Sequence, residues 1–217
     1  MSDVLSISST DSLDSPAVQE AVAALKSGQL AVIPTDTSYA VVADAFHHGA
    51  VALLRMAKQQ SPTIPVPVAA ATIDMAMGIA KMSNLASDLA NAFWPGPLTL
   101  LTQSQPSLSW SICDSRTALS IRVPKSQIAQ ILLQEVGPLA LTGAQLSGQG
   151  PIQSAQQAVT ALGQKVAVYL DAGELSHIVS SVIDATTSNL RLVRQGAITI
   201  GSIREVNPNV IDATVNQ

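Results

Sequence analysis

Two arginines, Arg122 and Arg194, lie in or at the end of predicted strands, where a buried cation would need an anionic partner. Arg122 lies inside LSIRVP, an apolar segment that predicts a strand ended by a proline. An unpaired buried guanidinium is costly, so it needs a structural carboxylate, such as Asp36 or Asp184, or a ligand carboxylate or phosphate held by two hydrogen bonds. Arg194, at another predicted strand end, is a weaker candidate because arginines there are often only solvated. The chemistry that both favour is the binding of an anion.

Three polar segments at the ends of predicted strands could line one cavity. The turn PTDTSY at 34–39 carries hydroxyls, a carboxylate and a phenol where α/β sheets bind ligands, although an ordinary hydrogen-bonded turn has the same residues. The segment TGAQLSGQG at 142–150 has glycines that let backbone N–H groups approach an anion, although a surface loop would look the same. Ser180-Ser181 opens a further strand. Together these segments predict a polar, anion-binding concavity without a metal cage.

Composition excludes several classes of protein. The chain has 217 residues, a length that favours one domain, and its 47% hydrophobic content can fill a sizeable core. A formal net charge of −4 and only 11 Lys and Arg residues argue against a strongly basic nucleic-acid binder. There is no Walker A motif, no dinucleotide fingerprint after a strand, no nucleophile elbow and no HExxH motif.

The cysteine and histidine content favours no metal or thiol chemistry. Cys113 is the only cysteine, which excludes an intramolecular disulfide or a cysteine cluster and suits a reducing compartment. The adjacent His47 and His48 diverge on a helix or a strand, so we expect helix capping near Gly49 and not a metal pair. The N-terminus is acidic and Ser-rich, unlike a secretory signal, and no apolar run reaches the roughly 20 residues that span a bilayer. We therefore expect a cytoplasmic protein without membrane contact.

Helical and extended patterns alternate along the chain, which predicts an α/β fold with a largely covered sheet. Residues 1–15 lack periodicity and are expected to form a flexible arm ahead of one domain at 16–217. A helix is expected to begin at Pro16 and to end at Gly28. The other expected helices are 49–58, 73–80, 84–93, 127–135 and 154–162, and the expected strands are 29–33, 40–43, 66–71, 98–102, 118–123, 139–142, 166–170, 179–185 and 190–193.

The order of the motifs is similar to that of a known family. PTDTSYAV, FWPGPLTLL, SIRVP, a Gly/Ser loop, SSVID and VRQGAI follow one another between about Gly28 and Gly201 and resemble the YrdC-like family, the L-threonylcarbamoyladenylate synthases. The resemblance implies a single-domain, twisted mixed α/β sheet with helices around an open, basic-lined cavity. It also implies an enzyme that joins L-threonine, bicarbonate and ATP into threonylcarbamoyl-AMP, releasing pyrophosphate, for the threonylcarbamoyladenosine modification of tRNA. Some members bind double-stranded RNA.

The resemblance also implies roles for individual residues. Lys58 and Arg122 are expected to be catalytic, with ATP as a substrate that brings Mg²⁺ and no metal bound by the protein itself. The residues expected to bind L-threonine are Thr35, Arg122, Gly143 and Ser180. The residues expected to bind the nucleotide are Lys58, Gln60, Gln145 and Arg194.

The chain departs from the family pattern mainly at expected ligand contacts. Gln60, Ile64 and Ala69 stand where Arg, Asn and His are usual, and Gly143-Ala144-Gln145 replaces Ser-Ala-Asn. Replacing an arginine by glutamine removes a permanent charge near phosphate, a loss of roughly 2–4 kcal/mol of transition-state stabilisation. Two hypotheses therefore remain open. One is a synthase, and the other is a catalytically attenuated relative that binds a nucleotide, an amino acid or, weakly, tRNA or double-stranded RNA.

Overall fold

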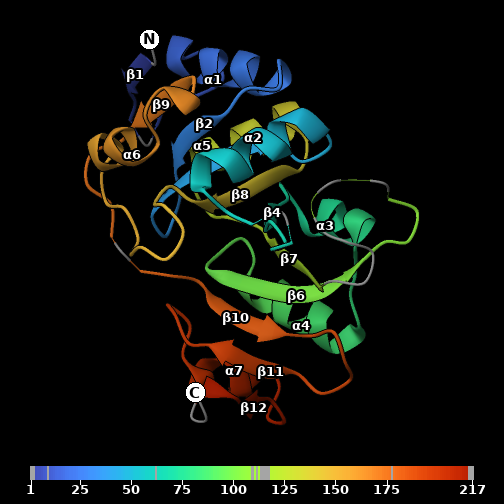
Figure 1. Ribbon diagram of the computed structural model, residues 1–217. Helices are drawn as coiled ribbons and strands as arrows, with labels where there is room; N and C mark the ends of the chain where they lie inside the picture. The colour runs from blue at the N-terminus through green and yellow to red at the C-terminus, as the bar shows by residue number, and fades with distance from the viewer. Residues whose placement is uncertain are drawn as a thin grey trace.

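The computed structural model describes residues 3–8, 10–61, 63–108, 110, 112, 118–176 and 178–214. In these ranges the strands form one twisted mixed sheet in the order β1-β9-β2-β3-β8-β4-β7-β6-β10-β11-β12, with β5 paired to β6 (Figure 1). The strands are β1 (Asp3–Ser6), β2 (Ala31–Pro34), β3 (Tyr39–Asp44), β4 (Val68–Ala69), β5 (Ala80–Lys81), β6 (Leu98–Ser104), β7 (Ala118–Arg122), β8 (Leu139–Gly143), β9 (Val168–Asp171), β10 (Ser181–Asp184), β11 (Arg191–Arg194) and β12 (Ile211–Asp212). The predicted α/β class and the mixed, twisted sheet are confirmed.

Helices cover both faces of the sheet. They are α1 (Pro16–Lys26), α2 (His48–Lys58), α3 (Ile73–Ile79), α4 (Asn84–Phe93), α5 (Gln127–Val136), α6 (Ala155–Leu162) and α7 (Ile200–Val206), with the short 3₁₀ turn η1 (Gly163–Lys165). Along β2, Ala31 and Ile33 pack with α1 and α5, whereas Val32 packs into the larger core on the other face. The strand therefore buries both faces through its period of two.

The termini of the helices follow ordinary capping chemistry. Ser83, Ser126 and Ser154 accept backbone N–H groups at the starts of α4, α5 and α6. His47 caps α2 because its Nδ1 accepts the Ala50 N–H at 3.0 Å. The expectation that the histidine pair serves helix capping is confirmed for His47.

The predicted N-terminal arm is wrong at Asp3–Ser6, which forms β1. This strand pairs in parallel with β9, and Leu5 packs against the core beside α1 and α5. A four-residue strand is too short for its alternation to stand out in the sequence. Helix α7 and strands β5 and β12 were not predicted either, and the expected strand at 66–71 is ordered as a strand only over Val68–Ala69. Cys113 lies outside the described residues.

Candidate active site

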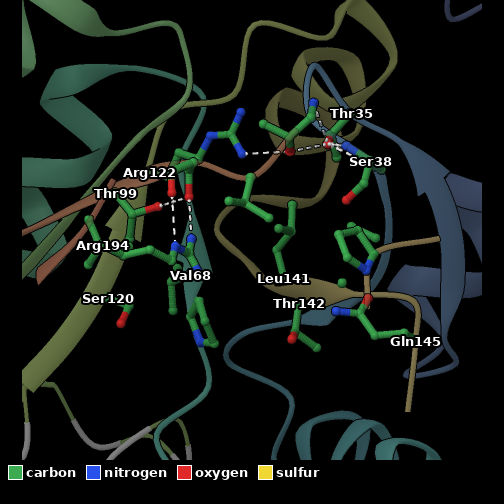
Figure 2. Close-up of a pocket in the computed structure, with 18 of the residues that line it drawn as sticks. Thr35, Ser38, Val68, Thr99, Ser120, Arg122, Leu141, Thr142, Gln145 and Arg194 are labelled. Carbon is green, nitrogen blue, oxygen red and sulfur yellow. Dashed lines mark hydrogen bonds between the residues drawn. The ribbon is translucent and has the colours of Figure 1, made fainter. Parts of the chain in front are cut away.

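A cavity of about 430 Å³ opens over the central strands of the sheet (Figure 2). Its wall is built from the β2–β3 turn and from strands β4, β6, β7 and β8. The start of β10 and the end of β11 complete it. Among the described residues that line it, the charged ones are Arg122 and Arg194, and no carboxylate is present in the lining. The polar residues of the lining are Thr35, Thr37, Ser38, Thr99, Ser120, Arg122, Thr142, Gln145, Gln149, Ser180 and Arg194.

Arg122 is fixed in the wall by three partners. Its side chain shares one face of β7 with Ser120, because the alternating residues Leu119 and Ile121 point into the core on the other face. Its Nε donates to the Gly96 carbonyl at 2.9 Å, and its Nη1 donates to Thr37 Oγ1 at 3.0 Å. Its Nη2 forms an ion pair with Asp36 Oδ2 at 2.6 Å.

The partner of Arg122 was left open by the sequence, and the structure identifies Asp36 as the structural carboxylate. Asp36 Oδ1 also accepts the Lys125 N–H at 3.1 Å, so both carboxylate oxygens are held. The other candidate, Asp184, instead accepts from the backbone N–H and hydroxyl of Thr186. Burial lowers the pKa of Arg122, whose residue is only 7% exposed, and the Asp36 charge opposes that shift. The guanidinium stays charged at neutral pH.

Thr35 shapes the turn that delivers Asp36 and Thr37. The Thr35 Oγ1 donates to the Ser38 carbonyl at 2.7 Å and accepts the N–H groups of Thr37 and Ser38 at 3.2 Å each. The Thr35 and Thr37 hydroxyls lie 3.0 Å apart. The turn is therefore a hydrogen-bonded ST-type turn and also a wall of the cavity, so both interpretations of PTDTSY hold.

Arg194 is fixed on the opposite side by Ser180. Its Nε donates to the Ser180 carbonyl at 3.0 Å and its Nη2 donates to Ser180 Oγ at 2.9 Å. The Ser180 Oγ also lies 2.9 Å from Thr99 Oγ1, because β10 runs parallel to β6 and brings these residues together. Although the residue as a whole is exposed, partial desolvation of the guanidinium and, after it, the positive charge of Arg122 lower the pKa of Arg194. The two arginines therefore share one electrostatic environment that an anion would relieve.

Lys58 does not line the cavity but holds the loop that does. Its Nζ donates to the carbonyls of Gly143, the last residue of β8, and of Gln145, two residues further on. The residue is 4% exposed, and burial lowers the pKa of its ammonium to about 8. In this arrangement the charge of Lys58 fixes the backbone of the 143–145 loop.

The structure brings together six of the eight predicted site residues: Thr35, Arg122, Gly143, Gln145, Ser180 and Arg194 line the cavity. Lys58 and Gln60 lie outside the lining, and the Gln60 N–H is bonded to the Arg55 carbonyl at 2.9 Å. Sequence reasoning missed Thr99 and Ser120 as lining residues. Thr142 lies in the TGAQLSGQG segment that was expected to line the cavity. A single hydroxyl in an apolar strand carries no functional signal, whereas Thr37 stood inside the PTDTSY turn already singled out.

Two other features, a metal-binding cluster and a membrane-spanning helix, are absent from the described part of the chain. No group of three or more His, Cys, Asp or Glu residues there is placed to hold a metal ion. Across the same residues, no helix combines the length and apolar character needed to cross a bilayer. Fold and site together define a mixed α/β protein with a polar cavity whose charged lining residues, among those described, are two arginines.

The chain belongs to the Sua5_yciO_yrdC family, whose model, described as "Telomere recombination", matches residues 23–196. It is 41% identical to a putative threonylcarbamoyl-AMP synthase of Mycobacterium tuberculosis over 191 residues, which cover 87% of this chain and 88% of that one. It is 29% identical to the threonylcarbamoyl-AMP synthase of Pyrococcus abyssi, covering 84% of this chain and 54% of that one.

Solved structures support the same family. The crystal structure of P. abyssi Sua5 complexed with L-threonine superimposes with a TM-score of 0.89 at 26% identity, covering 97% of this chain. The present chain spans 62% of the length of that protein. Escherichia coli YciO shares the fold, with a TM-score of 0.84, 22% identity and coverage of 94% of this chain and 100% of that one.

Proposed function

We propose that this chain is an L-threonylcarbamoyladenylate synthase, which converts L-threonine, bicarbonate and ATP into threonylcarbamoyl-AMP, pyrophosphate and water. The observation that carries the proposal is the pair of arginines, each oriented by its own protein partners, in a cavity whose described lining has no carboxylate. The names of the mycobacterial and archaeal relatives and the L-threonine in the P. abyssi structure support the same reaction.

In this proposal, Arg122 binds the carboxylate of L-threonine. A guanidinium has five N–H groups, and three of them are used by Gly96, Thr37 and Asp36, which leaves one on each terminal nitrogen. Asp36 orients the guanidinium, so its remaining donors are positioned before the substrate arrives. Thr35 and Ser180 line the cavity and supply hydroxyl groups for the polar end of the amino acid.

Arg194 is assigned to the phosphate groups of ATP. Its hydrogen bonds to Ser180 use two N–H groups and leave three for the nucleotide. The carbamate formed from L-threonine and bicarbonate would attack the α-phosphorus, and pyrophosphate would leave with the electrons of the broken P–O bond. The protein's contribution is then to position both substrates and to stabilise negative charge.

We propose that Mg²⁺ enters with ATP as part of the substrate. The described lining offers hydroxyl, amide and carbonyl oxygens and no carboxylate, so the phosphate oxygens and water would supply its ligands.

Lys58 and Gln60 keep the predicted roles at the nucleotide only if the segment around them approaches the cavity when ATP binds. We further propose a cytoplasmic location and a product that serves tRNA modification, with weak binding of tRNA or double-stranded RNA at most.

The experiment that tests the proposal is pyrophosphate release by the purified chain, with L-threonine, bicarbonate or ATP omitted in turn. We expect release that requires all three substrates. The matched control is Arg122→Ala, whose folding is checked by circular dichroism and which should lose the L-threonine-dependent release of pyrophosphate. If folded wild-type protein released no pyrophosphate, the synthase proposal would be refuted and the nucleotide- or amino-acid-binding relative would replace it.

A further inference from the structure

The side chain of Gln145 occupies the space that a side chain at position 143 would need. A Cβ placed on Gly143 would lie 2.3 Å from Gln145 Oε1 and 2.9 Å from both its Cδ and its Nε2. These distances are far shorter than an ordinary van der Waals contact, so the two positions are coupled by sterics. The amide can pack against Gly143 only because position 143 has no side chain.

The amide packed there has an unsatisfied acceptor. Gln145 Oε1 is closed to solvent and has no hydrogen-bond partner among the described residues. A buried carbonyl oxygen without a donor is destabilised relative to one that is paired. Because the oxygen is closed to solvent in this position, a ligand donor reaches it when the amide turns away from Gly143.

The backbone around Gln145 is held in place, so the side chain is the part that can move. Lys58 Nζ holds the carbonyls of Gly143 and Gln145, and the buried Ala144 donates its N–H to the Tyr39 carbonyl at 3.0 Å. Figure 2 shows Gln145 beside Thr142, on the side of the view opposite Arg194. Arg122, Arg194 and Gln145 line the same cavity, so a ligand that spans it contacts the arginines with its anionic end and Gln145 with the other end.

We propose that Gln145 is a movable, specificity-determining ligand contact, whose amide leaves Gly143 when substrate binds and accepts a hydrogen bond from a hydroxyl or amino group of that substrate. The identity of the substrate rests on the proposed function, in which L-threonine and ATP both carry such donors. The arginines then bind the anionic groups of the substrates, and Gln145 accepts a hydrogen bond from a neutral or cationic donor.

Two substitutions test the proposal because they have opposite expected signs. Gln145→Ala removes the acceptor and should weaken the binding of one substrate about tenfold, the usual size of one hydrogen bond. Gly143→Ala displaces the amide from its packed position, at small cost because the clashing atoms end a flexible side chain. It should therefore tighten the binding of the same substrate about two- to fivefold. The reason is that a larger fraction of the free protein already has the Gln145 amide away from position 143.

The double variant distinguishes steric coupling between positions 143 and 145 from simple filling of the cavity by the added methyl group. Gly143→Ala should change affinity only when Gln145 is present, so in the Gln145→Ala background it should have no effect. Titrations with L-threonine, with L-2-aminobutyrate, which lacks the hydroxyl, and with ATP identify which donor is read. If Gly143→Ala weakened binding equally in both backgrounds, the added methyl group would merely fill the cavity and the proposal would be wrong.

Side-chain amide resonances give a second readout that does not depend on turnover. The ¹H–¹⁵N signal of the Gln145 amide, assigned by its loss in Gln145→Ala, should shift on substrate addition and should lie near its bound position in ligand-free Gly143→Ala. An unchanged signal in both cases, with wild-type turnover intact, overturns the inference alone. If wild-type protein shows no pyrophosphate release and none of the three titrants shifts the signal, both the inference and the proposed function fail.

Discussion

Gly196 is the position where a single methyl group should displace the wall of the cavity. A Cβ at this residue would lie 2.3 Å from the Val179 carbonyl oxygen and 2.5 and 2.6 Å from the Ser180 carbonyl carbon and oxygen. These atoms belong to the backbone and are themselves hydrogen-bonded: the Ala197 N–H donates to Val179, and Arg194 Nε donates to Ser180. None of these three atoms is the end of a flexible side chain that could move aside.

The size of the effect follows from those distances. Ordinary contact begins near 3.4 Å, so Gly196→Ala requires a separation of about 1 Å more than the native backbone allows. Overpacking of this kind costs about 1–3 kcal/mol. We expect a loss of about 2 kcal/mol in the free energy of unfolding and a fall in Tm of about 4–8 °C. A displacement of about 1 Å in Ser180 and Arg194 should also lower kcat/KM about 100-fold.

The assays are thermal unfolding and steady-state pyrophosphate release. Gly78→Ala is the matched control because a Cβ at Gly78, in α3, meets nothing within 4 Å. In a helix, alanine should stabilise that site by up to about 1 kcal/mol and leave activity unchanged. A Gly196→Ala protein as stable and as active as the wild type would refute the steric reasoning about this wall.

Two further predictions concern the charged residues. Arg122→Lys keeps the charge but loses the planar fork that contacts Asp36, Thr37 and Gly96, so L-threonine should bind 10- to 100-fold more weakly in calorimetry; unchanged affinity would show that the fork is not used. The folded-state pKa of Lys58, about 8, lies below the ordinary 10.5, so the unfolded chain binds this proton more tightly. The free energy of unfolding of the wild type should therefore rise as the pH increases from about 8 to 10.5, by up to about 3 kcal/mol, and this rise should be missing in Lys58→Met. Parallel pH profiles of the two proteins in urea unfolding would contradict this assignment.

Much of the fold could be predicted because local patterns were strong. Helix α4 has the predicted bounds, since its apolar face is periodic and Trp94-Pro95-Gly96-Pro97 ends it. Strands β1, β5 and β12 escaped prediction because two to four residues show no period, and pairing with a neighbouring strand decides their conformation.

The site was predicted in part, for a similar reason. Arg122 stood out because a cation in an apolar strand demands a partner, and Asp36 was one of the partners considered. Thr99 was missed because only the parallel pairing of β6 with β10 brings it to Ser180, 81 positions away in sequence. The placement of Lys58 could not be predicted either, since its acceptors are backbone carbonyls in a loop 85 and 87 positions along the chain.

The central claim is that the arginine-lined cavity joins the carbamate of L-threonine to the α-phosphate of ATP. The most direct test is mass spectrometry of the nucleotide products formed by the purified chain from ¹³C-bicarbonate, L-threonine and ATP. We expect threonylcarbamoyl-AMP that carries the ¹³C label, and no such product from Arg122→Ala. Unlabelled AMP alone, or ATP left intact by folded wild-type protein, would contradict the proposed synthase reaction.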